Sequence, residues 1–267
     1  DGVDGFGILL IQRKEQRTKG RPDQVAGAGA EHHDHGKGRD VAGVEPIGQN
    51  IAGVKGNPQH QDLDVQELQQ KPVAARQRTG RIRRAAARFP DKEFSTLAYL
   101  YTMNPPKHVK PLPNVNIMLC DIDCDREVTL TENASGKEFV KAMEGWSKIT
   151  NNIFVWDYGI NFDNYLAPFP NFHILQDNIR LFKKNHATMH FSQIAGSRGG
   201  DFAELRAYLV SKLMWNPEVN VDSLMQHFLH GYYGEAAPYL YQYIKIMEGA
   251  LIGSGQRLWI YDSPVSH

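Results

Sequence analysis

The sequence lacks several features that would narrow its class at once. Its 267 residues include only two cysteines, Cys120 and Cys124, too few for a disulfide framework. The 30 basic and 30 acidic residues cancel, so net charge gives no reason to expect nucleic acid or another anionic partner. No run of about 18 apolar residues is present, so we expect no membrane span. The first residues lack a basic start and a small-residue cleavage site, so we identify no signal peptide.

The first third of the chain also lacks aromatic residues. All 4 Trp and all 11 Tyr lie at Tyr99 or later, and Phe6 is the only aromatic residue before Phe89. Residues 1–88 are instead rich in Gly, Gln, Arg, Ala and His, a composition that cannot bury enough apolar surface to offset the entropy of ordering. We therefore expect residues 1–88 to be disordered or poorly packed, and residues 89–267 to form the folded domain.

Two clusters in this early segment have both a functional and a plainer interpretation. The run Glu31–His35 contains metal-binding side chains but lacks the spacing of a known site, so adventitious binding is favoured. A basic run has no interleaved aromatic residues to stack on bases, so a solvated charged face is favoured over nucleic-acid binding; it consists of Arg76, Arg78, Arg81, Arg83, Arg84 and Arg88. A further hypothesis is that this segment is the translation of a wrong reading frame joined to a real domain, because the composition changes abruptly near residues 85–89.

From Phe89 onward, strand and helix patterns alternate. β-Branched and aromatic runs predict strands at residues 95–101, 115–120, 153–156 and 187–192. Apolar residues at helical spacing predict helices at residues 139–149, at a segment ending near Lys183, and in a tail at 202–213, at 224–229 and from Pro238 onward. Gly231 and Gly234 are expected to separate the last two helices. Strands joined by crossovers indicate an α/β fold with a parallel sheet.

Polar and aromatic side chains follow the end of each predicted strand. In parallel α/β folds, ligands bind at the carboxyl ends of the strands, where such side chains converge. Carboxylates beside Trp and Tyr suit a sugar, because its hydroxyls form hydrogen bonds while its C–H face packs on an aromatic ring. The candidate site residues are Tyr101, Asp121, Asp123, Trp156, Asp157, Tyr158, Asn161, His190 and Gln193.

These candidates also have purely structural interpretations. Asp121, Asp123 and Asp125 form an ordinary polar turn in one interpretation and part of a site in the other, with about equal support. A histidine inside an apolar strand, such as His190, is more often a hydrogen-bonded core residue than a catalytic base. Buried thiols are favoured over metal ligands for the two cysteines. Core packing is the expected role of two tryptophans in helical or apolar context, Trp215 and Trp259.

Four motifs in order resemble the domain-of-unknown-function family 4838. They begin at Phe94, Asn116, Val155 and Glu204, and read FSTLAYLY, NIMLCDIDC, VWDYGINFDNY and ELRAYLVSKLMWNP. That family occurs in bacterial polysaccharide-degrading repertoires and is regarded as a glycoside-hydrolase-like TIM barrel, related to α-glucuronidase and hexosaminidase barrels. The resemblance covers residues 89–267 and implies a partial (β/α)8 TIM barrel, comprising roughly the fifth to the eighth strands and the C-terminal helices.

The resemblance implies a fragment of a carbohydrate-active enzyme of the glycoside hydrolase type. It makes Asp121 or Asp123 the candidate acid/base, with Asp157 as a further catalytic or orienting group. Substrate would be bound by Tyr101, Trp156, Tyr158, Asn161, His190 and Gln193. In related glycosidases the general acid commonly follows the fourth strand, so this chain is expected to lack half of the carboxylate pair and to be inactive alone. The alternative is a non-catalytic carbohydrate-binding barrel.

Further expectations concern partners and location. The expected partner is a glycan, without a cofactor, a metal ion or a nucleic acid. A partial barrel leaves strand edges unpaired, so we also expect self-association through those edges. The usual export of the family implies a periplasmic or cell-surface location.

Overall fold

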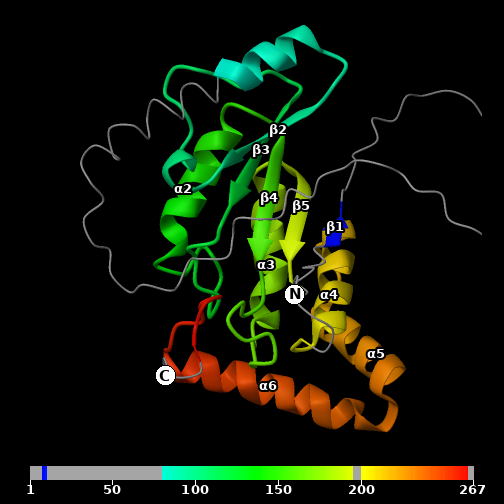
Figure 1. The fold of residues 1–267 in the computed structure, drawn as a ribbon. Coiled ribbons are helices and arrows are strands. Elements are labelled where there is room, and N and C mark those ends of the chain that lie inside the picture. The colour runs from blue at the N-terminus through cyan, green and yellow to red at the C-terminus, as the bar shows by residue number, and fades with distance from the viewer. Residues whose placement is uncertain (1–7, 11–79, 195–199, 264–267) are drawn as a thin grey trace, which may run out of the picture. The chain divides into compact units, whose positions relative to one another are not determined.

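The computed structural model describes residues 8–10, 80–194 and 200–263, all within one compact unit of the chain (Figure 1). The run Glu31–His35 and most of the early segment lie outside these residues. The elements in chain order are β1 (Ile8–Leu10), a helix at residues 80–88, β2 (Phe94–Ala98), β3 (Val115–Cys120), α2 (Gly136–Ser147), β4 (Ile153–Tyr158), α3 (Leu175–Lys184), β5 (Ala187–Gln193), α4 (Ala203–Trp215), α5 (Val221–Tyr233) and α6 (Ala237–Ser254).

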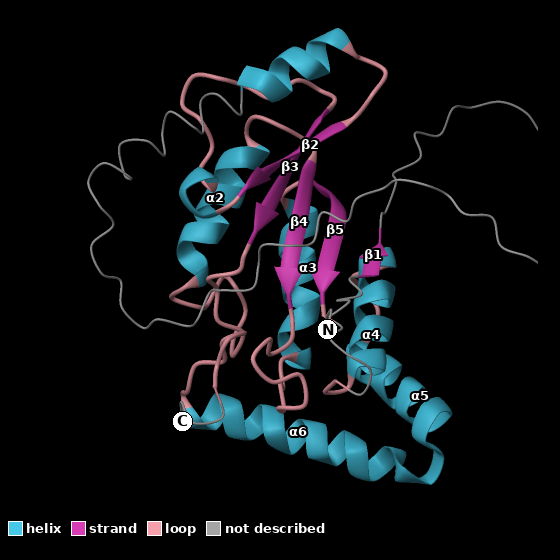
Figure 2. Cartoon of the chain, viewed as in Figure 1, coloured by secondary structure: helices cyan, strands magenta, loops and turns pink. Residues whose placement is uncertain are grey.

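A parallel sheet lies at the centre of the described region (Figure 2). β2, β3, β4 and β5 pair in parallel, and strands that follow one another in sequence are neighbours in the sheet. β1 pairs antiparallel with the outer edge of β5, whereas the outer edge of β2 has no strand partner among the described residues. The predicted α/β fold with parallel strands is therefore confirmed.

One face of the sheet packs against helices and forms the main hydrophobic core. Side chains alternate along a strand, so Ile117 and Leu119 of β3 and Ile153 and Val155 of β4 share this face. They pack in one cluster with residues from α2, α3 and α4, among them Phe139, Met143, Phe182, Leu205 and Leu209. The first residue of α2 must be small, because a Cβ on Gly136 would lie 2.2 Å from the carbonyl oxygen of Leu130.

The opposite face of the sheet carries a second, smaller cluster. Its buried members come from the ends of β3 and β4, from the loop after β4 and from the segment after α6: Cys120, Tyr158, Phe169, Leu258 and Ile260. Two backbone hydrogen bonds attach that last segment, from Arg126 N to Leu258 O at 2.7 Å and from Phe162 N to Ile260 O at 2.7 Å. The C-terminal segment thus covers part of the sheet face that carries no helices.

The tail consists of three helices, as predicted. α4 ends before Pro217, Asn220 caps α5 by accepting a hydrogen bond from Ser223 N at 2.7 Å, and Pro238 lies in the first turn of α6. Gly231 was expected to lie between helices but belongs to α5, which ends instead at Gly234 with a φ of 56°. In the described part of the chain, no helix is long and apolar enough to cross a membrane.

Two further local predictions were wrong. The first strand ends at Ala98 rather than at residue 101, because the Thr102 hydroxyl accepts a hydrogen bond from Tyr99 N at 3.0 Å and donates one to Tyr99 O at 2.9 Å. These bonds close a 3₁₀ turn at Leu100–Thr102 instead. Trp215, expected in the core, is the last residue of α4 and is 82% exposed.

The folded region begins earlier than the composition predicted. The helix at residues 80–88 buries Ala86 in the main core, and the carbonyl of Ala86 accepts a hydrogen bond from Asn114 Nδ2 at 3.0 Å. Asn114 also donates to the carbonyls of Phe89 and Lys92. The composition change near residues 85–89 therefore falls inside a packed element. The arginines of this helix, at positions 81, 83, 84 and 88, are exposed.

Candidate functional site

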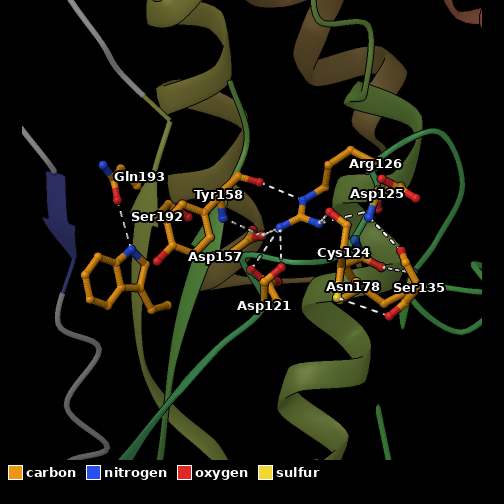
Figure 3. A network of polar contacts seen from close by, with 12 residues as sticks. Asp121, Cys124, Asp125, Arg126, Ser135, Asp157, Tyr158, Asn178, Ser192 and Gln193 are labelled. Atoms are coloured by element: carbon orange, nitrogen blue, oxygen red, sulfur yellow. Dashed lines mark hydrogen bonds and ion pairs between the residues drawn. The ribbon is translucent and has the colours of Figure 1, made fainter. Parts of the chain in front are cut away.

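The candidate residues at the end of β4 point to two different faces of the sheet. Trp156 and Tyr158 lie on the face without helices, and Asp157 between them points toward the helices. Asp121 directly follows β3 in the same alternation as Leu119 and lies next to Asp157 (Figure 3). The residues that are contiguous in sequence therefore divide into a buried charged group and an aromatic group.

Arg126 is the centre of the buried charged group (Figure 3). Its side chain is 1% exposed, and its Nη2 donates to Asp121 Oδ1 at 2.9 Å and to the Asp121 carbonyl at 3.0 Å. The same nitrogen lies 3.7 Å from Asp157 Oδ1. Nε donates to the carbonyl of Tyr158 at 2.8 Å, and Nη1 donates to the carbonyl of Cys124. One guanidinium thus connects the carboxyl ends of β3 and β4 to the loop that carries it.

The two carboxyl groups beside Arg126 differ in acidity. Burial raises the pKa of Asp121 well above its usual value; the Arg126 charge opposes this shift and the Asp157 charge adds to it. Burial also raises the pKa of Asp157, but the contact with His190 and the charge of Arg126 outweigh it, so the net pKa is lowered. Asp121 is therefore the carboxyl that protonates more readily, and Asp157 is the one that keeps its charge.

Ser192, His190 and Asp157 are the residue types of a hydrolytic triad, but their geometry does not match one. Ser192 Oγ lies 2.9 Å from His190 Nε2, and Asp157 Oδ2 lies 3.7 Å from the same nitrogen. A triad uses opposite ring nitrogens for serine and aspartate. All three residues are buried on the helix side, and the His190 ring centroid is 5.5 Å from that of Phe182. His190 is thus a hydrogen-bonded core histidine.

The aromatic group forms a continuous row on the other face. Ring centroids are 5.3 Å apart between Phe191 and Trp156, 5.5 Å between Trp156 and Tyr158, and 5.9 Å between Tyr158 and Phe162. The contacts continue to Tyr261 at 5.7 Å and from there to Trp259 at 5.2 Å. We call this set the aromatic row: Phe191, Trp156, Tyr158, Phe162, Tyr261 and Trp259. It links β4 and β5 to the C-terminal segment.

Gln193 fixes the indole of Trp156 within the row. Its Oε1 accepts a hydrogen bond from Trp156 Nε1 at 3.0 Å (Figure 3). Trp156 remains partly exposed, whereas Tyr158 is only 4% exposed. The Trp156 ring is therefore a held, partly open aromatic surface beside an amide.

Exposed carboxylates lie near Tyr261, at the end of the aromatic row that the C-terminal segment forms. Burial raises the pKa of Tyr261, and the charges of Asp163 and Asp123 raise it further. Burial and then the charge of Asp123 also raise the pKa of Tyr99, which packs against the smaller cluster. Asp123 and Asp163 are both exposed, and so is Tyr101, the middle residue of the turn after β2. This end combines tyrosines with carboxylates.

Asn161 holds the loop that follows β4. Its Nδ2 donates to the carbonyl of Asp262 at 2.7 Å, and its Oδ1 accepts from the backbone N–H groups of Asp163 and Asn164, each at 2.9 Å. Asn161 is 6% exposed. It therefore positions Asp163 and the C-terminal segment, and its amide is occupied within the chain.

The two cysteines are free and buried. Burial raises the pKa of the Cys120 thiol to about 12, and burial also raises that of Cys124. Cys120 packs in the smaller cluster and Cys124 in the main core, on opposite faces of the sheet. Buried thiols, the interpretation favoured from the sequence, match this placement.

Several residues of these groups were missed in the sequence. Arg126 and Ser192 complete the buried charged group, and the row includes Phe162 and Tyr261 beside Trp259, which had been assigned to the core. The alternation of β4 was a usable signal, since it places Asp157 opposite to Trp156 and Tyr158. No local pattern marked the segment after α6 as part of the site.

The fold and these groups define an α/β protein with aromatic and acidic side chains at the carboxyl ends of parallel strands. Residues 80–245 match the family model described as Domain of unknown function (DUF4838), and the chain belongs to this family. The matched region includes the helix at residues 80–88 and all four motifs of the resemblance. No curated protein and no solved structure matches the chain.

Proposed function

We propose that the chain contributes to a carbohydrate-active domain of the glycoside hydrolase type, in which the aromatic row binds an oligosaccharide or polysaccharide. The row carries this proposal, because aromatic rings bind the C–H faces of sugars while neighbouring amides and carboxylates bind hydroxyl groups. Trp156 is the central platform, since it is partly exposed and held by Gln193. Asp123, whose charge acts on Tyr261 of the row, would contact hydroxyl groups, and we propose the same role for the exposed Tyr101.

We further propose that the parallel sheet is part of a (β/α)8 barrel wall. In such a barrel, consecutive strands are neighbours, helices cover the outside, and ligands bind at the carboxyl ends of the strands. The order β2, β3, β4, β5 and the helix-covered face support this arrangement. The aromatic row would then line the interior, and the charged group around Arg126 would lie behind the wall.

This arrangement changes the roles expected for three residues. Asp121, Asp157 and His190 lie on the helix side, where Arg126 and Ser192 are their partners. We propose that they position the strand ends that carry the row, rather than contact substrate. Asp123 remains the candidate acid/base, but an acid at neutral pH needs a desolvated carboxyl, and Asp123 is exposed. We therefore propose little or no turnover by this chain alone.

Titration calorimetry with a panel of neutral and uronic-acid oligosaccharides tests the proposal. Wild-type protein is expected to bind at least one of them, and Trp156→Ala is expected to weaken that binding at least about tenfold, since one stacking contact contributes ~1.4 kcal/mol or more. Trp215→Ala is the matched control, because Trp215 is 82% exposed and outside the row. Absence of binding across the panel, or equal affinity of wild type and Trp156→Ala, would contradict the proposal.

A non-catalytic carbohydrate-binding barrel is the second candidate. It is favoured by the engagement of Asp121 with Arg126, which leaves that carboxyl unable to reach the row. Binding without release of aryl alcohol from aryl glycosides and glucuronides would support it. Robust hydrolysis that is lost in Asp123→Asn would instead establish the enzyme.

A further inference from the structure

One face of α6 is exposed, and none of its residues carries a charge. Its large residues are Tyr239, Tyr243 and Ile246, which are 73%, 42% and 68% exposed. The same helical face continues through smaller residues, and a Cβ added to Gly249 or to Gly253 would meet nothing within 4 Å. We call this the α6 face: Tyr239, Gln242, Tyr243, Ile246, Gly249, Ala250 and Gly253.

The charged side chains of α6 point away from this face. Lys245 Nζ lies 2.8 Å from Asp222 Oδ1 and 3.2 Å from Glu248 Oε2. Glu248 is 4% exposed, and its Oε1 also accepts a hydrogen bond from the backbone N–H of His173 at 2.9 Å. Both charged residues of the helix therefore have partners within the unit, and the exposed face is uncharged. α6 lies on the side toward which the arrowheads of β4 and β5 point (Figure 1).

The α6 face is complementary to itself. If a second α6 runs antiparallel and a two-fold axis passes through Ile246, each tyrosine meets a glycine of the other copy. The opposed pairs are Tyr239 with Gly253, Gln242 with Ala250, Tyr243 with Gly249, and Ile246 with its own copy. Alternating large and small side chains across two helices allow them to interdigitate. Glycines weaken a helix interior, and no contact within the described chain explains why two of them lie on this face.

We propose that the α6 face is the contact of a two-fold symmetric homodimer, with the α6 helices antiparallel. A two-fold contact uses the same patch on both copies, and an uncharged patch brings no like charges together across the axis. From Tyr239 to Gly253 the α6 face is about 21 Å long, on a helix roughly 10 Å wide, so an antiparallel pair of such faces buries well under the ~1,600 Å² of a standard interface. That area is at the low end for specific complexes, so the dimer is expected to be weak and concentration-dependent.

Sedimentation equilibrium over a concentration series of the full chain tests the dimer. Ile246→Glu places two carboxylates at the axis, so the dissociation constant is expected to rise at least tenfold. The unfolding temperature should stay unchanged, because Ile246 is 68% exposed. Ile252→Glu is the matched control: it makes the same change on the same helix, at a residue that is 53% exposed but points about 120° away from Ile246. This control should dimerise like wild type.

Gly249→Leu separates a lost contact from a damaged fold. In the monomer the new side chain meets open space and replaces a poor helix former, so the unfolding temperature should rise. In the dimer the same side chain collides with Tyr243 of the second copy, so association should weaken. A stabilised monomer with lost dimerisation is the expected result. A stabilised variant that dimerises like wild type would overturn the antiparallel register.

A complementary pair of double variants completes the test. Tyr239→Ala/Tyr243→Ala removes both large rings from the face, and Gly249→Tyr/Gly253→Tyr fills both glycine positions that would accept them. Each should be monomeric alone, and an equimolar mixture should form heterodimers. A wild-type chain that stays monomeric at its highest soluble concentration would overturn the proposal. So would a dimer that persists in Ile246→Glu, and such a dimer would point to pairing through the open edge of β2 instead.

Discussion

The two faces of the parallel sheet differ in chemistry, although the residues concerned are adjacent in sequence. One face buries charged side chains, and the other carries a row of aromatic side chains. On the helix face, Asp121, Asp157 and Arg126 bury charge within a few ångströms, with exposures of 7% or less. On the other face, the stacked rings of Trp156 and Tyr158 form part of a row of ring contacts that ends at the exposed Tyr261 and the partly exposed Trp259. The first arrangement tolerates little change, because both aspartates depend on the charge of Arg126. The second arrangement leaves aromatic surface partly exposed, and a ligand can pack against it.

The difference shows how a site can be supported from behind. Arg126 donates to the carbonyl of Tyr158 at 2.8 Å, so the buried charged group fixes the backbone of a residue in the aromatic row. The backbone N–H of Arg126 also donates to Leu258 O at 2.7 Å, next to Trp259. One residue therefore holds both the strand and the C-terminal segment that carry the row. Rigid support of this kind is what a preorganised binding surface needs.

Among the substitutions that test this comparison, replacement of Arg126 should lower the free energy of unfolding most. Arg126→Met leaves Asp121 and Asp157 buried without their cation, and a broken buried ion pair typically costs about 3–5 kcal/mol. Arg257→Met is the control, since the Arg257 side chain is 57% exposed beside Asp125 and exposed pairs contribute about 0–1 kcal/mol. Urea unfolding followed by tryptophan fluorescence measures both. Equal losses for the two variants would show that the buried charged group is not the support.

The two aspartates should respond to pH in opposite directions. The pKa of Asp157 is lowered in the folded state, so its charge stabilises the fold above the unfolded pKa of about 4, and this contribution is lost as pH falls through the folded pKa. The pKa of Asp121 is raised, so its contribution is present below pH ~4 and is lost as pH rises through its folded pKa. At neutral pH, Asp157 therefore stabilises the fold, whereas an ionised Asp121 opposes it.

Neutral substitutions separate these contributions. Asp157→Asn is expected to lower the free energy of unfolding at pH 7 by about 1–3 kcal/mol, with a smaller loss near pH 3. Asp121→Asn retains an acceptor for Arg126 and should be neutral or stabilising at pH 7. Urea unfolding at a series of pH values measures both, with exposed Asp163→Asn as the control. A larger loss for Asp121→Asn than for Asp157→Asn would reverse the assignment.

The strands of the fold were predictable because their signals are local. The β-branched and aromatic runs at Val115–Cys120 and from Ile153 onward predicted β3 and β4, and the alternation of strand and helix patterns predicted their parallel pairing. The division of the candidate site between two faces was not predicted, although the alternation of side chains along β4 indicates it. Neighbouring residues of a strand point to opposite faces, so Asp157 and Trp156, which the sequence predicts in one candidate site, lie on different faces of the sheet.

The remaining features depend on contacts between distant segments. Arg126 follows β3, but its backbone partner Leu258 lies after α6, and no periodic pattern connects them. Asn161 likewise meets Asp262 through a hydrogen bond that joins two irregular segments. Composition was misleading at residues 80–88, where a helix rich in arginine buries only a narrow stripe that includes Ala86. Tertiary packing decided these cases, and a single sequence does not display it.

The smallest expected effect concerns the hydrogen bond that orients Trp156. Gln193→Ala removes the acceptor of the indole N–H, which should cost about 1 kcal/mol of stability. If Trp156 is the sugar platform, glycan affinity should fall in Gln193→Ala, but less than in Trp156→Ala, because the ring stays in place with less restraint. Gln193→Glu keeps an acceptor for the indole and should retain more affinity than Gln193→Ala. Calorimetry on the three variants gives the order. An unchanged affinity in Gln193→Ala would mean that the contacts of the Trp156 ring with Tyr158 and Phe191 alone hold it in place.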